Sequence, residues 1–124
     1  KEGKYDEAIK IYEKLIKTTP NPEQSLNAQL MLALSLVGKK EFEQGITQMR
    51  AIITRYPNHD ISAKAQYLIA YSYLTHQKYA EALIEYEKLI TKYPKSSYVP
   101  KAKEFVEKLT KMFNEEKKRK GIGK

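Results

Sequence analysis

A sequence phrase that recurs every 37 residues constrains the fold of this chain more than any other feature. The three copies read GKYDEAIKIYEKLIKTTP, KKEFEQGITQMRAIITRYP and QKYAEALIEYEKLITKYP, and they close at Pro20, Pro57 and Pro94. Self-similarity at a fixed period of this length is typical of repeat architectures. We therefore expect an array of similar structural units along the 124 residues.

Each copy of the phrase has the hydrophobic spacing of an amphipathic helix. Charged residues such as Glu81, Glu85 and Lys88 are expected on the face opposite the apolar stripe. Two further helical segments lie between the copies, at residues 22–37 and 60–75. In the third copy the stripe consists of Tyr79, Ala82, Leu83, Tyr86, Leu89, Ile90 and Tyr93.

Each unit is thus a pair of helices, and one pair alone cannot bury its apolar stripe. Stacked pairs form a continuous core, so we expect an all-α solenoid of about six helices. Asn21 is a predicted N-cap, and Pro22 suits the first helical position. Gly45 stands where the other copies have Ala8 and Ala82. Because glycine inside a helix costs about 1 kcal/mol relative to alanine, we expect a close helix contact at Gly45.

This pattern resembles the tetratricopeptide repeats. The family's first helix carries a small residue and then an aromatic one, as at Ala70 and Tyr73. Its second helix carries small, aromatic and proline positions, as at Ala82, Tyr86 and Pro94. The longer period and the stretch RYPNHDISAKAQYLIAYSYL are similar to a subfamily of bacterial envelope proteins, of the outer-membrane β-barrel assembly lipoprotein type and the Tol-Pal periplasmic coordinator type.

The resemblance implies a right-handed solenoid of antiparallel helix pairs. It also implies a non-catalytic scaffold that binds a protein or peptide partner, located in the periplasm or the cell envelope, although a cytoplasmic location stays open. The expected organisation is the second helix of a truncated repeat at residues 1–20, complete repeats at 21–57 and 58–94, a capping helix at 95–119 and a basic tail at 120–124.

The two ends of the array are expected to differ. The first helix lacks its usual partner, which leaves Tyr5, Ile9, Tyr12 and Ile16 partly uncovered and favours a homodimer. The last helix, at about residues 97–118, keeps an inward stripe but has a polar outer face, as a solenoid cap requires. The members of that stripe are Ala102, Phe105, Val106, Leu109, Met112 and Phe113.

The formal charge of +8 is concentrated at the C-terminal end. Residues 1–94 carry 13 basic and 11 acidic side chains, whereas residues 95–124 carry 10 and 4. The closing stretch EEKKRKGIGK is interpreted as a solvated, disordered end, and the alternative is attachment to an anionic membrane or to nucleic acid. Nucleic acid is disfavoured because no aromatic residue is interleaved with the basic residues Lys117, Lys118, Arg119 and Lys120.

The sequence contains no constellation typical of catalysis or metal binding. Cysteine is absent, and the two histidines, His59 and His76, lie in different turns, where we expect them to be solvated. The terminal GIGK follows no strand and opens no helix, so it does not form a phosphate-binding loop. We therefore expect neither an enzyme nor a cofactor or metal site.

The resemblance also implies that the first helices of successive units line a concave groove. With the packing stripe subtracted, the predicted groove residues are Asn27, Leu30, Leu34, Lys64, Tyr67, Tyr71, Leu74, Lys101 and Lys108. This surface suits a peptide with apolar anchors and an acidic end. The chaperone-type carboxylate clamp is not matched, since Leu30 and Leu34 occupy its positions. As an alternative to a role in the groove, Tyr67 and Tyr71 pack against a neighbouring helix. For the chain as a whole two other functions stay open, a basic adaptor or a self-assembly module.

Overall fold

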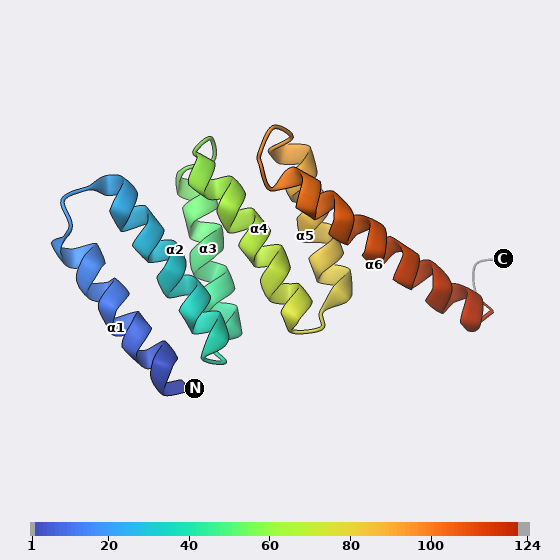
Figure 1. The fold of residues 1–124 in the computed structure, drawn as a ribbon, viewed down its shortest axis with the longest axis horizontal. Helices are drawn as coiled ribbons and strands as arrows, with labels where there is room; N and C mark the ends of the chain where they lie inside the picture. Colours follow the sequence, from blue (N-terminus) through green and yellow to red (C-terminus); the bar gives the residue numbers. More distant parts are fainter. Residues whose placement is uncertain (1, 122–124) are drawn as a thin grey trace.

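The computed structural model describes residues 2–121, which form helices joined by short turns (Figure 1). No strand occurs within this range. The all-α helical-repeat fold that the sequence predicts is thereby confirmed. The helices are α1 (Glu2–Thr18), α2 (Pro22–Gly38), α3 (Phe42–Arg55), α4 (Asp60–Thr75), α5 (Tyr79–Lys92) and α6 (Val99–Arg119).

Side-chain caps fix where α2 and α4 begin. Asn21 Oδ1 accepts hydrogen bonds from the backbone N–H groups of Glu23, at 2.8 Å, and Gln24, at 3.1 Å, which confirms the predicted cap. At the start of α4 the cap is His59, one residue later in the repeat than Asn21, and its Nδ1 accepts from Ile61 N at 2.9 Å. His59 Nε2 lies 2.8 Å from Glu23 Oε2. The prediction of a merely solvated loop histidine was therefore wrong for His59, which connects the start of α4 to the start of α2.

Consecutive helices pack against each other, and α4 also contacts α2 (Figure 1). The apolar side chains form two clusters, one among α2, α3 and α4 and the other among α4, α5 and α6. Tyr73 on α4 packs against both clusters. Each helix pair thus completes its core with residues of the next pair, as a stack of repeats requires.

The close helix contact expected at Gly45 is present. Gly45 is buried on α3, and a Cβ added there would lie 2.5 Å from Ala33 O and 2.6 Å from Val37 Cγ2 on α2. Both distances are shorter than real Cβ contacts. Because one of the two obstacles is a backbone oxygen, a rotamer change cannot relieve it.

Helix α1 packs against α2 and makes no comparable contact with another helix of the described residues. One of its sides therefore faces solvent. Tyr5 is exposed, and Ile9, Tyr12 and Ile16 are half-buried, in accord with the expected partial exposure. The most exposed apolar side chain of α1 is Ile11, at 58%, which the sequence interpretation did not single out. The homodimer expected from these residues stays a prediction.

Helix α6 closes the array at the other end. Its inward stripe is confirmed, with Ala102 and Leu109 buried and the four remaining members packed against the second cluster. The expectation of disorder for EEKKRKGIGK was wrong in part, because Lys117, Lys118 and Arg119 form the last turn of α6. Glu116 pairs with Arg119 at 3.0 Å and helps to hold that turn in place. Residues 122–124 of the predicted tail lie outside the described residues.

The hydroxyl of Tyr86 gives a direct test of the second cluster. Tyr86 is fully buried, and its Oη has no hydrogen-bond partner among residues 2–121. Burial raises the pKa of Tyr86 above its ordinary value, so the hydroxyl stays protonated. Since an unpaired buried polar group costs about 1–3 kcal/mol, we expect Tyr86→Phe to stabilise the fold by about 1 kcal/mol in urea melts.

The matched control for Tyr86→Phe is Tyr71→Phe, which removes a hydroxyl from an exposed ring. This control should leave the melting midpoint unchanged. A lower midpoint for Tyr86→Phe would show that the buried hydroxyl makes a stabilising hydrogen bond.

Candidate functional site

The first-helix face is the name used here for the surface of the predicted groove residues on α2, α4 and α6. Its most exposed aromatic residue is Tyr71 on α4, with 42% of its surface accessible. The Tyr71 ring stacks on Tyr67, one turn earlier, with centroids 6.4 Å apart and an interplanar angle of 10°. This contact favours one orientation of the ring, and a restricted ring loses less entropy on binding.

Tyr67 is a packing residue as well as a neighbour of this surface. Its ring lies 5.0 Å from that of Tyr98 and 5.8 Å, edge to face, from that of buried Tyr86. Burial, and then the proximity of Tyr71, raises the pKa of Tyr67. The alternative that this tyrosine packs against neighbouring helices therefore describes Tyr67, whereas Tyr71 projects to solvent.

Leu30 does not belong to the first-helix face, so its inclusion was wrong. It is 0% exposed and lies in the cluster among α2, α3 and α4. The physical reason is that α3 and α4 both pack on α2. Together they bury more of the α2 surface than α3 alone would bury. On the same helix Leu34 is half-buried and Asn27 is exposed.

Basic side chains surround the α6 part of the face. Lys101 and Lys108 are exposed. Lys101 Nζ lies 3.6 Å from Glu104 Oε1 and 5.5 Å from the centroid of Phe105. On α4, Lys64 and Leu74 are half-buried, and Leu74 packs against the second cluster. The accessible face thus combines one exposed tyrosine with a basic stretch and is less apolar than expected.

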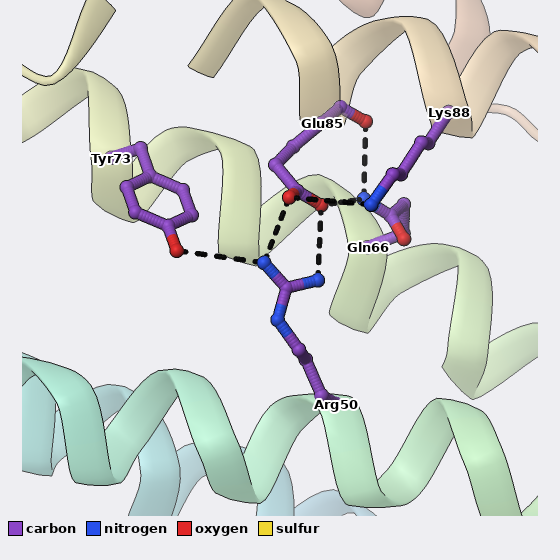
Figure 2. A network of polar contacts seen from close by, with 5 residues as sticks. All are labelled: Arg50, Gln66, Tyr73, Glu85 and Lys88. Atoms are coloured by element: carbon purple, nitrogen blue, oxygen red, sulfur yellow. Dashed lines mark hydrogen bonds and ion pairs between the residues drawn. The ribbon is translucent and has the colours of Figure 1, made fainter. Parts of the chain in front are cut away.

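A buried ion pair connects the helices behind this face, and sequence reasoning missed it (Figure 2). Glu85 on α5 is 4% exposed. Arg50 on α3 donates to both of its carboxylate oxygens, at 2.8 and 3.3 Å. Gln66 Nε2 on α4 donates to Glu85 Oε1 at 2.8 Å and to its backbone oxygen at 3.1 Å. Three helices therefore meet at one carboxylate.

The electrostatics of the pair favour its charged form. Burial raises the pKa of the Glu85 carboxyl, but hydrogen bonds from Arg50 and Gln66 outweigh it, so the net shift is downward. The hydrogen bond to Glu85 raises the pKa of Arg50, and burial opposes this shift without cancelling it. Lys88 adds a contact of 3.6 Å to Glu85 Oε2. Because each carboxylate oxygen is already engaged, we assign the network a structural role.

The placement of Glu85 corrects the expectation that it would lie on the solvent face of α5. The signal that could have revealed it is a break in the repeat, since Ile11 and Gln48 occupy its position in the other copies. Likewise Glu13 and Glu87 are the equivalents of Arg50, so the second copy has a positive charge where the other two copies have a negative one. Oppositely charged departures from a repeat are thus candidates for an ion pair between units.

Residues 2–121 contain no group of three or more His, Cys, Asp or Glu side chains that could hold a metal ion. In the same range, no helix has both the length and the hydrophobicity of a membrane span.

Comparison with known proteins identifies the family. The model of the YfiO family, described as outer membrane lipoprotein, matches residues 1–117. No curated protein matches the chain. The family match confirms the resemblance to repeat lipoproteins of the bacterial envelope that the repeat pattern indicates. Because the match spans almost the whole of the 124 residues, this chain belongs to the YfiO family of outer membrane lipoproteins.

Proposed function

We propose that this chain is a non-catalytic scaffold that binds a protein partner through its first-helix face as part of a bacterial cell-envelope assembly. The observation that carries the proposal is the exposure of Tyr71 on a helical array of an envelope lipoprotein family. An accessible tyrosine that stacks on a neighbouring ring has the properties of an interface anchor.

The roles of the residues follow from their surroundings. Tyr71 supplies apolar contact area and a hydroxyl, and Tyr67 beneath it fixes the ring. Lys101 and Lys108 attract an acidic segment of the partner and set its orientation. Exposed charges of this kind affect the association rate more than the affinity. The proposed partner segment therefore carries an apolar side chain opposite Tyr71 and carboxylates opposite α6.

Tyr71→Ala should weaken binding of the partner by about 1–3 kcal/mol, the range of an aromatic anchor. It should leave the unfolding midpoint nearly unchanged, because the ring is exposed. The measurement is titration calorimetry with the partner recovered by cross-linking at position 71, together with thermal melts of each variant.

The matched control is Tyr56→Ala, since Tyr56 is a tyrosine of similar exposure, 37%, outside the face. This variant should bind normally. Tyr67→Ala should lower the melting midpoint because it removes the contacts with Tyr86 and Tyr98. Equal losses of affinity for Tyr71→Ala and Tyr56→Ala would contradict the assignment of the binding surface.

A further inference from the structure

An apolar groove lies between the beginning of α5 and the end of α6, outside the surface discussed so far. Its volume is about 550 Å³. Its floor consists of Ala80, Leu83, Ile84 and Phe113, and its rim of Glu116, Lys117 and Lys120. Ile84 is 52% exposed, so a large aliphatic side chain is accessible in the groove.

The groove exists because α6 does not turn where earlier repeats do. Phe113 is 37 residues after His76, which begins the turn between α4 and α5. Helix α6 instead continues to Arg119, so its last turns form a wall beside the first turns of α5. Within residues 2–121 no later helix covers Leu83 and Ile84 on this side.

This groove is separate from the first-helix face. An α-helix turns by about 100° per residue, so Lys117 lies about 180° around α6 from Lys108. The floor residues of α5 belong to a second-type helix, whereas the first-helix face is formed by α2, α4 and α6. One partner can therefore occupy each surface independently.

The charge around the groove is net positive. The four consecutive basic residues Lys117, Lys118, Arg119 and Lys120 follow two acidic residues, Glu115 and Glu116, at the end of α6. Glu116 already pairs with Arg119 at 3.0 Å and Lys120 at 3.2 Å. Lys117 and Lys118 form no ion pair within the described residues. An occupant that carries carboxylates beside apolar side chains complements both features of the groove.

We propose that this groove docks an acidic amphipathic segment of a second protein partner. Aliphatic or aromatic side chains of that segment lie on Leu83, Ile84 and Phe113, and its carboxylates meet Lys117 and Lys120 at the rim. The groove is open, with Ile84 half accessible, and this shape suits a helix that lies along it. A small ligand would need an enclosed pocket to bury most of its surface.

Subtractive peptide selection tests this proposal with a randomised library in place of the natural partner. A phage library of helical peptides is first depleted on Ile84→Glu and then selected on the unaltered chain. We expect the recovered peptides to carry apolar residues at i, i+3 or i+4 spacing and an excess of Asp and Glu. Their affinity for Ile84→Glu should be at least about tenfold lower, which corresponds to about 1.4 kcal/mol.

The control variant is Ile11→Glu, which alters an isoleucine of similar exposure, 58%, on α1. It should bind the recovered peptides normally, and so should Tyr71→Ala, so failure here is distinguishable from failure of the first-helix face. Three outcomes would overturn the proposal. Either no peptide survives depletion, or the survivors lack acidic residues, or Ile84→Glu weakens binding of the chain to phosphatidylglycerol vesicles but not to the recovered peptides. Circular dichroism shows whether each variant is folded.

Discussion

Gly45→Leu should destabilise the fold by about 3 kcal/mol, at the upper end of the usual cost of overpacking. The first atom of the new side chain would already lie 2.5 Å from the backbone oxygen of Ala33. Helices α2 and α3 would have to separate, which disrupts the first hydrophobic cluster. Helix propensity alone predicts the opposite, a gain of up to about 1 kcal/mol. Urea denaturation followed by circular dichroism distinguishes the two.

The control for Gly45→Leu is Gly3→Leu on α1. Apart from its chain neighbours and the backbone of α1, no atom lies within 4 Å of a Cβ built at Gly3, so this variant should have unchanged or slightly higher stability. A normal midpoint for Gly45→Leu would show that α2 and α3 pack less closely at this point than the structure indicates.

Glu85→Ala should destabilise the fold by about 3 kcal/mol, the lower end of the cost of breaking a buried ion pair. The lower end applies because the Arg50 side chain is 40% exposed and can be rehydrated when its partner is removed. Gln66, which is buried, loses its side-chain acceptor and keeps only the backbone oxygen of residue 85. The control is Glu87→Ala, an exposed glutamate on the same helix, for which we expect almost no change.

The same ion pair predicts a dependence of stability on pH. The folded pKa of Glu85 is lower than its unfolded value, so the stabilisation is fully present above the unfolded pKa. It is lost as the pH falls below the ordinary glutamate range, about 4.3, and through the folded pKa. The stability difference between the unaltered chain and Glu85→Ala should therefore shrink between neutral pH and strongly acidic pH. A difference that is constant with pH would show that Glu85 is not ionised in the fold.

The repeat pattern predicted the helices well because each helix is specified locally. The segment predicted at residues 60–75 coincides with α4, and the segment predicted at 22–37 differs from α2 by one residue. Pro22 and the Asn21 cap fix the start of α2 through contacts within three residues. Gly45 was also interpretable, because a glycine inside a helix requires a compensating contact.

The candidate site was less predictable because contacts between repeats decide which residues stay exposed. Leu30 lies on the side of α2 that α4 covers, and Tyr67 lies under Tyr98, which precedes α6. Glu85 pairs with an arginine that is 35 residues away in the sequence. These pairings depend on how far one unit rotates relative to the next, and the stripe of a single helix carries no information on that rotation.

The central claim, that the first-helix face binds a protein, is tested most directly by site-specific photo-cross-linking in the source bacterium. A benzophenone amino acid is placed at Tyr71 or Lys108 on the face and, as controls, at Tyr56 or Glu87 outside it. We expect a discrete protein adduct from the first two positions and none from the controls. Adducts from Tyr56 or Glu87 alone, or no adduct from Tyr71 and Lys108, would contradict the claim.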